Sequence, residues 1–133
     1  MNKKDLITIR DGKPEDQGFI FATWLRGLRY GNSWFELIES VVYFKVYHDF
    51  IESILLRPTT TIKVACLKDD PEVILGYAVY SGPTLHWVFV KKAWRSIGIA
   101  KSLVPTNTTI VTHMTNVGLS ILKKHKNVHF NPF

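Results

Sequence analysis

Hydrophobic and polar residues alternate at the start of the chain and then change to a helical spacing. The run "LITIR", residues 6–10, alternates as a short strand does. The turn-like stretch "DGKPEDQ" follows, and Pro14 with two acids behind it is typical of a helix start. The apolar spacing predicts that this first helix runs from residue 14 to residue 29.

A second and longer helix is predicted after the break at "YGNS". Ser33 and Glu36 form the S-x-x-E pattern of a capping box, and the helical spacing continues up to Pro58. One stripe of this helix recurs at helical spacing and is therefore expected to be buried: Leu37, Val41, Phe44, His48, Ile51 and Leu55. On this stripe we expect His48 to be a hydrogen-bonded, partly buried residue rather than a catalytic one.

Three β-rich runs then follow one another with short connections. They are "TTTIKVACL" (59–67), "VILGYAVY" (73–80) and "LHWVFV" (85–90), separated by the turns "KDDPE" and "SGPT". Connections this short favour an antiparallel meander. The remaining pattern predicts a short helix stopped by Pro105, a strand at 108–114, a helix at 116–126 and a last short strand at 128–133.

The predicted order is therefore β-α-α-β-β-β-α-β-α-β, an α/β fold with helices around one mixed, mostly antiparallel sheet. The 133 residues suit a single domain, residues 1–133, with 46% hydrophobic and 21% charged residues. The single cysteine, Cys66, excludes an internal disulfide and fits a reducing compartment such as the cytoplasm. We see no signal peptide and no apolar run long enough to cross a membrane.

The balance of charge favours an anionic partner. The formal net charge is +6 and the pI is about 9.5, which suits nucleic acid, a membrane surface or a phosphorylated cofactor. No recognition helix and no aromatic pattern of an RNA-binding sheet is visible, so nucleic acid is not expected as the partner. The pair His125 and His129 has i,i+4 spacing, but no further ligand pattern supports a metal site.

The stretch "VKKAWRSIGIAKSLV", residues 90–104, carries the most specific pattern in the chain. Arg95, Gly98 and Ala100 follow a strand at the spacing R-x-x-G-x-A and open a helix. Backbone N–H groups at such a junction bind phosphate, and small residues let the ligand approach the backbone. The stretch is neither a Walker loop nor a full dinucleotide-binding fingerprint, and a purely structural turn is the alternative.

The element order, the "ILGYAVY" strand and "VFVKKAWRSIGIA" together resemble the GNAT superfamily of N-acetyltransferases. Its central motif is a strand ending in Val followed by [QR]-x-x-G-x-[GA], and nearly the whole chain shares the resemblance. The resemblance implies that acetyl-CoA or another acyl-CoA binds here as cosubstrate, without a metal. The residues it implies in CoA binding are Val88, Val90, Arg95, Ser96, Ile97, Gly98, Ile99, Ala100, Lys101 and Asn116.

The catalytic residues of the family are not all matched. A base is needed to deprotonate the acceptor amine, and the family's frequent Glu falls on Thr84 here. His86 lies two residues further on the same strand face and has a pKa suited to this work, although a strand histidine can equally be structural. The family's tyrosine acid falls on Lys123. Tyr80 is the candidate substitute, with Tyr77 and Tyr30 as alternatives, and a structural role is the other interpretation of each.

The resemblance therefore implies an N-acyltransferase that moves an acyl group from CoA to an amine, with the amine entering near Tyr30 and Trp34. The missing Glu and Tyr leave open a protein that has lost catalysis and serves as a structural or interaction component, for example of a bacteriophage particle. The general style of the sequence is similar to that of compact phage-encoded members. The C-terminus lacks the family's usual final strand pair, so a second copy of the chain is one way to complete the acceptor cleft.

Overall fold

The computed structural model describes residues 2–115, 125 and 127–132. Its helices are η1 (Lys3–Leu6), η2 (Pro14–Asp16), α1 (Gln17–Tyr30), η3 (Ser33–Leu37), α2 (Ser40–Leu55), η4 (Lys92–Trp94) and α3 (Ile99–Leu103). Its strands are β1 (Ile7–Asp11), β2 (Thr61–Leu67), β3 (Ile74–Ser81), β4 (Thr84–Val90), β5 (Ile110–Val111) and β6 (His129–Phe130). The predicted α/β class and the order of the described elements are confirmed.

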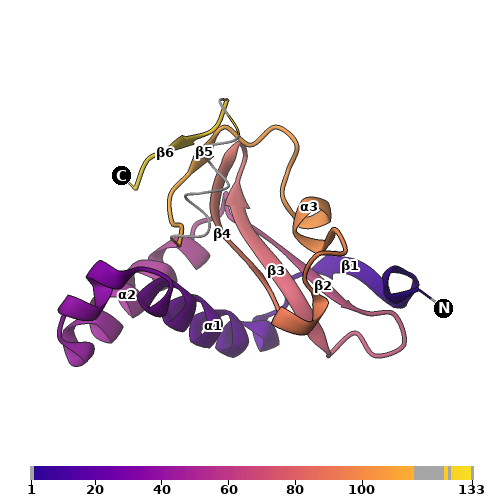
Figure 1. Ribbon diagram of the computed structural model, residues 1–133, viewed down its shortest axis with the longest axis horizontal. Coiled ribbons are helices and arrows are strands. Elements are labelled where there is room, and N and C mark those ends of the chain that lie inside the picture. Colours follow the sequence, from indigo (N-terminus) through magenta and orange to yellow (C-terminus); the bar gives the residue numbers. More distant parts are fainter. Residues whose placement is uncertain (1, 116–124, 126, 133) are drawn as a thin grey trace.

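All six of these strands form one mixed sheet in the order β1-β2-β3-β4-β5-β6. The first four are antiparallel neighbours, as the short turns predicted, whereas β5 pairs parallel with β4 and β6 pairs parallel with β5. Figure 1 shows α1 and α2 together beside one face of this sheet and α3 beside the other. The sheet therefore separates two hydrophobic layers.

The larger layer lies between the sheet and the helices α1 and α2. Trp24 of α1 is fully buried and stacks on Trp87 of β4, with ring centroids 5.8 Å apart. Tyr43 and Ile51 of α2 are buried in the same layer. The smaller layer lies under α3, where Ile99 and Leu103 pack with residues of β2, β3 and β4. Burial of these side chains is the main stabilising contribution to the fold.

The predicted buried stripe of the second helix is wrong at three positions. Leu37 is 88% exposed, Val41 is 74% exposed and the side chain of His48 is 47% exposed. The segment starts as the 3-10 helix η3 and α2 begins only at Ser40, so Leu37 lies outside the second helix. Within α2, Ile51 is buried as predicted, and the other fully buried residues are Tyr43 and Ile54, each one position before a residue of the predicted stripe.

Two further expectations from the sequence differ from the structure. Of the strand predicted at 108–114, only Ile110–Val111 forms the strand β5, although Thr109 and Thr112 on either side also donate backbone hydrogen bonds to the carbonyls of Pro83 and Leu85. The predicted helix at 116–126 lies almost entirely outside the described residues. Neither difference changes the fold class.

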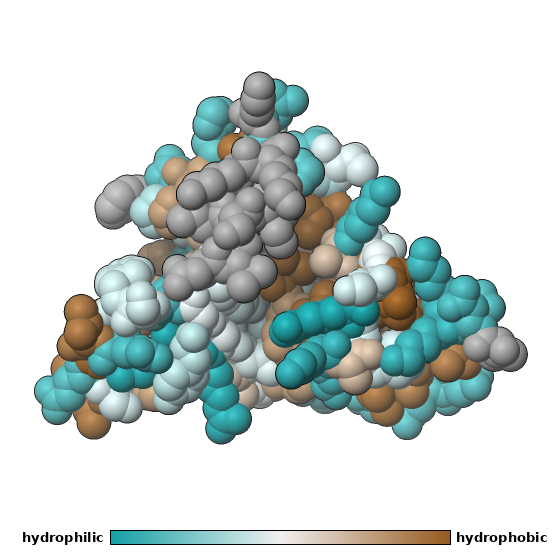
Figure 2. Space-filling view, viewed as in Figure 1, coloured by the Kyte–Doolittle hydropathy of each residue, from teal (hydrophilic) through white to brown (hydrophobic). Residues whose placement is uncertain are grey.

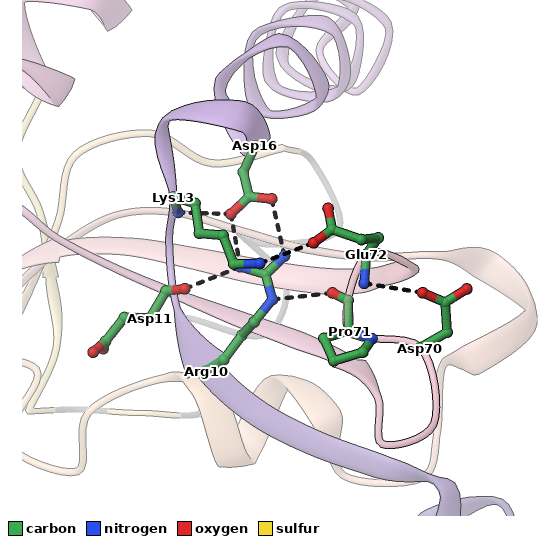
Figure 3. A network of polar contacts seen from close by, with 7 residues as sticks. All are labelled: Arg10, Asp11, Lys13, Asp16, Asp70, Pro71 and Glu72. Atoms are coloured by element: carbon green, nitrogen blue, oxygen red, sulfur yellow. Dashed lines mark hydrogen bonds and ion pairs between the residues drawn. The ribbon is translucent and has the colours of Figure 1, made fainter.

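A buried ion pair joins β1 to the start of α1 (Figure 3). Arg10 donates two hydrogen bonds to the carboxylate of Asp16, at 2.8 and 2.9 Å, and Asp16 also accepts from the backbone N–H of Lys13. Arg10 Nε donates to the carbonyl of Pro71, in the turn between β2 and β3. The network therefore holds three chain segments at one end of the sheet.

Candidate functional site

The strand β4 contains a bulge at His86. Val79 of β3 pairs with Trp87, whereas the next residue, Tyr80, pairs with Leu85, so His86 is an extra residue on β4. A bulge of this kind breaks the alternation of side chains along a strand. Trp87 lies in the layer under α1 and α2, Leu85 lies in the layer under α3, and the inserted His86 faces the same side as Trp87.

The sheet opens beside the same residue. In the described part of the chain β5 pairs with β4 only at Thr84 and Leu85, and one further bond joins the backbone N–H of Thr112 to the carbonyl of Leu85, at 3.0 Å. Beyond this point the register ends although β4 continues to Val90. The two strands therefore separate, and the separation starts at the bulge.

A cavity of about 460 Å³ lies where His86 meets the second helix. Its lining comes from α2 and the loop after it, from β4 and β5, and from the chain after β6: Phe50, Ile54, Arg57, Thr84, His86, Ile110, Thr112, His113, Asn131 and Pro132. This size is within the range of small-molecule sites. Thr84 and His86 both line it, which confirms that they share a face.

Two histidines and a threonine form a chain of hydrogen bonds in this cavity. The distances are 2.9 Å from His86 Nδ1 to Thr112 Oγ1 and 2.8 Å from Thr112 Oγ1 to His113 Nδ1. The hydroxyl of Thr112 has one hydrogen, so it donates to one imidazole and accepts from the other. His86 is 4% exposed, and its Nε2 atom has no hydrogen-bond partner in the described structure.

Both imidazoles are held in the neutral form at neutral pH. Burial, with a smaller contribution from the positive charge of Arg57, lowers the pKa of His86. Burial lowers the pKa of His113 to about 4, and the neighbouring His86 adds to this effect. His113 sits between the rings of Trp24 and Phe50, at centroid distances of 5.6 and 5.2 Å. A neutral His86 can accept a proton at Nε2.

The second predicted feature, the loop "RSIGIA", lies at the other end of β4. Ser96 and Gly98 both have positive φ, at 68° and 87°, and Gly98 precedes the first residue of α3. Glycine suits such a position because it has no Cβ. No described residue accepts a hydrogen bond from the backbone N–H groups of residues 97–101. These groups are therefore available to an anion.

Arg95 has a structural contact at this loop. Its Nε donates to the carbonyl of Val90 at 2.9 Å, which ties the loop to the end of β4. A hollow of about 360 Å³ lies beside the loop and is lined by Lys4, Ile7, Ile9, Ile97, Gly98, Ile99, Lys101 and Ser102. Of the predicted CoA-binding residues, Ile97, Gly98, Ile99 and Lys101 thus line one hollow, while Val88 and Val90 pack under α3.

Sequence analysis missed two lysines that approach this loop from the N-terminus. Lys3 Nζ donates to the carbonyl of Ala93 at 2.7 Å and lies 4.9 Å from the ring centroid of Trp94. A Cβ built on Gly98 would lie 3.9 Å from Lys4 Nζ. The sequence "NKK" does not by itself indicate a place beside this loop, because only the pairing of β1 with β2 brings the segment beside α3.

The structure separates other residues that the sequence grouped with His86. Tyr80 packs in the layer under α3, on the opposite face of the sheet, so it cannot act beside His86. Tyr30 and Trp34 are 66% and 56% exposed and are not among the residues that line the cavity. The acceptor side is instead lined by Phe50, Ile54 and Arg57. Asn116 lies outside the described residues.

Neither a metal site nor a membrane span is found in the described part of the chain. No three His, Cys, Asp or Glu side chains there gather as a metal would require, and no helix there has both the length and the apolar character needed to cross a bilayer.

Comparison with known proteins gives a match at the level of structure. No family model matches the sequence, and no curated protein matches it significantly. A protein of Pyrococcus furiosus, provisionally named an acetyl transferase, superposes with a TM-score of 0.54 and 16% identity, over 94% of this chain and 81% of that one. The chain has a GNAT acetyltransferase fold.

A second solved structure gives a similar superposition. Apo YjaB from Escherichia coli matches with a TM-score of 0.51 and 21% identity over 74% of this chain, which spans 61% of that protein. At these identities the likeness establishes the GNAT fold, and chemistry must be argued from the residues of this chain. The resemblance inferred from "VFVKKAWRSIGIA" is thereby confirmed at the level of the fold.

Proposed function

We propose that this protein is an acyl-CoA-dependent N-acyltransferase that transfers an acetyl or other acyl group to an amine. The observation that carries the proposal is the construction of β4. At one end of this strand, the following loop has five backbone N–H groups without an acceptor. Near the other end lies the buried His86, whose Nε2 has no hydrogen-bond partner in the described structure. In a GNAT fold, this combination supports binding of CoA at the loop and deprotonation of an amine at His86.

The loop fits the pyrophosphate of CoA by shape and by charge. The N–H groups of residues 97–101 would donate to the phosphate oxygens, and Lys4 and Lys101 line the same hollow. Arg95 would hold the loop through its bond to Val90. Val88, Val90, Ser96, Ile99 and Ala100 belong to the same strand, loop and helix start, and Asn116 remains a proposed contact. When bound, acyl-CoA supplies an activated acyl thioester.

His86 is proposed as the base that takes the proton from the acceptor amine. A neutral imidazole whose Nδ1–H donates to Thr112 carries a free lone pair on Nε2. His86 Nδ1–H donates to Thr112, whose hydroxyl donates to His113 Nδ1, so the chain of hydrogen bonds fixes the tautomer and the orientation of the His86 ring. Thr112 and His113 are positioning residues in this scheme. Tyr80 has no role in it.

The experiment is calorimetric titration with acetyl-CoA and CoA, followed by a turnover screen with amines. Micromolar binding that Gly98→Asp weakens would support the loop assignment. Turnover that His86→Gln lowers by about 10²–10⁴-fold, without loss of CoA binding, would support the base assignment. No binding at millimolar acetyl-CoA would refute the proposal.

A second candidate is a GNAT-fold protein that binds without catalysis, as a structural or interaction component. Thr84 replaces the expected acid, and an apolar surface is exposed near the start of α2, where Leu37, Val41 and Val46 are more than half exposed. Figure 2 shows hydrophobic residues reaching the surface at the α2 end of the molecule. CoA binding without turnover on any amine would favour this candidate.

A further inference from the structure

The two halves of the chain differ in charge. The last acidic residue is Glu72, and residues 73–133 contain no Asp or Glu. The same half contains the basic residues Lys91, Lys92, Arg95, Lys101, Lys123, Lys124 and Lys126. Every strand and loop from β3 onward is therefore free of acidic side chains.

The cavity at His86 continues this pattern. No acidic side chain is among its ten lining residues, and its one permanently charged side chain is Arg57. Arg57 follows the end of α2 and is exposed, and it makes no ion pair with a described residue. The segment outside the described residues cannot supply an acidic side chain either, because residues 116–124 contain none.

A cationic ligand would meet a positive field in this cavity. An ammonium group near Arg57 would have no carboxylate to balance its charge, which disfavours the protonated form. An anionic group would instead gain a charge-assisted, bidentate partner in the guanidinium. The remaining walls are apolar at Phe50, Ile54, Ile110 and Pro132.

We propose that the cavity takes a small primary amine that also carries an anionic group, a carboxylate or a phosphate monoester, as the acyl acceptor. Arg57 holds the anion, and the amine points toward Nε2 of His86. The apolar walls accept a hydrophobic body, as in an α-amino acid with an aliphatic side chain. This inference rests on the proposed acyltransferase function, and it adds the class of acceptor.

The field of Arg57 also fits the chemistry. The same positive charge that lowers the pKa of His86 lowers the pKa of an amine bound beside it. A lower pKa leaves more of the amine in the uncharged form, which is the form that attacks a thioester. Arg57 would thus act twice, by binding the anion and by offsetting the negative charge of that anion, which would otherwise stabilise the protonated amine.

The test measures binding to the full chain without CoA. Protein labelled with ¹⁵N in its histidines is titrated with L-leucine and with L-leucine methyl ester, which keeps the amine and the side chain but lacks the carboxylate. O-phosphoethanolamine and ethanolamine form the second pair. We expect the anionic member of a pair to shift the His86 and His113 signals at concentrations about 10–100-fold lower than its partner. The pair with the larger difference identifies carboxylate or phosphate as the anion.

Arg57→Gln is the decisive variant and Arg26→Gln its control. Both arginines are exposed, but Arg26 lies on α1 and does not line the cavity. We expect Arg57→Gln to remove the preference for the anionic probes and Arg26→Gln to keep it. Equal binding of ester and acid by the wild type, preference for the ester, or no binding of any probe at millimolar concentration would overturn the inference.

Titration with acetyl-CoA separates this inference from the proposed function. If CoA binds and the anionic amines do not, the acceptor class is wrong and the acyltransferase proposal stands. If leucine binds and CoA does not, the acyltransferase proposal fails and the acceptor role fails with it.

Discussion

The ion pair between Arg10 and Asp16 should make a large contribution to stability at neutral pH. The perturbation is Asp16→Asn, which keeps the size of the side chain and removes its charge. The carboxylate is 4% exposed and the guanidinium 14% exposed, and Asp16 accepts three hydrogen bonds, two from Arg10 and one from the backbone of Lys13. The variant leaves the positive charge of Arg10 partly buried without its partner.

Loss of one partner from a fully buried pair costs about 3–5 kcal/mol, which is an upper limit here because the Arg10 side chain is only partly buried. The total free energy of unfolding of a domain is about 5–15 kcal/mol, so the variant should lose a large fraction of it. For a chain of this size the loss corresponds to a fall in Tm of about 10–20 °C. The assay is thermal unfolding followed by circular dichroism, with urea unfolding as a second measure.

The pH dependence gives a sharper test than the size of the effect. Hydrogen bonds from Arg10 hold the pKa of Asp16 below its ordinary value of 3.8. Because the folded-state pKa is the lower one, the stabilisation is complete above the unfolded-state pKa and is lost as the pH falls through the folded-state pKa. The gap between wild type and Asp16→Asn should therefore be constant above about pH 5 and narrow below pH 4.

Asp11→Asn is the matched control. Asp11 also forms an ion pair, with Lys63, but its side chain is 80% exposed. Exposed pairs contribute little, so this variant should unfold within a few degrees of the wild type. Equal effects of the two variants, or a gap for Asp16→Asn that stays constant down to pH 2, would refute the assignment of a buried, charge-dependent contact.

Three further predictions concern the site loop, the second helix and the buried histidine. Gly98→Asp should weaken CoA binding at least about tenfold, because it adds a negative charge and because a side chain is strained at φ 87°. Gly82→Asp is the control: Gly82 also has positive φ, but a Cβ there would meet no atom within 4 Å, so CoA binding should be unchanged in the same titration. Ile51→Ala should cost about 2–5 kcal/mol in urea unfolding and Val41→Ala less than about 0.5 kcal/mol, and a similar loss for both variants would instead support the stripe predicted from the sequence. The lowered pKa of His113, about 4, makes the folded state lose stability as the pH falls from about 6.5 to 4, and ¹⁵N NMR should show this ring neutral at pH 5.5. A protonated His113 at that pH would contradict its burial between aromatic rings.

The loop "RSIGIA" was found from the sequence because its signal is local. Gly98 is needed where φ is positive, and its place between a strand and a helix can be recognised from neighbouring residues alone. Lys4, by contrast, is about ninety residues away in the chain, and Arg57 lies after a helix that the motif does not include. Their placement depends on strand order and helix packing, which a local sequence pattern does not encode.

The sequence by itself determined the class of fold, the order of most elements and the position of the glycine loop. These depend on periodicity, turn residues and backbone preferences, which act over a few residues. The tertiary structure alone decided which apolar residues of α2 are buried: Tyr43, Ile51 and Ile54 are covered, whereas Val41, also on an apolar stripe, is exposed. It also decided what His86 can do. The bulge at His86 depends on the register between β3 and β4, and its hydrogen-bonded link to Thr112 and His113 depends on the position of β5 beside β4. Contacts between distant segments form where burial and hydrogen bonding of the whole sheet are satisfied together, so no single stretch of the chain can specify them.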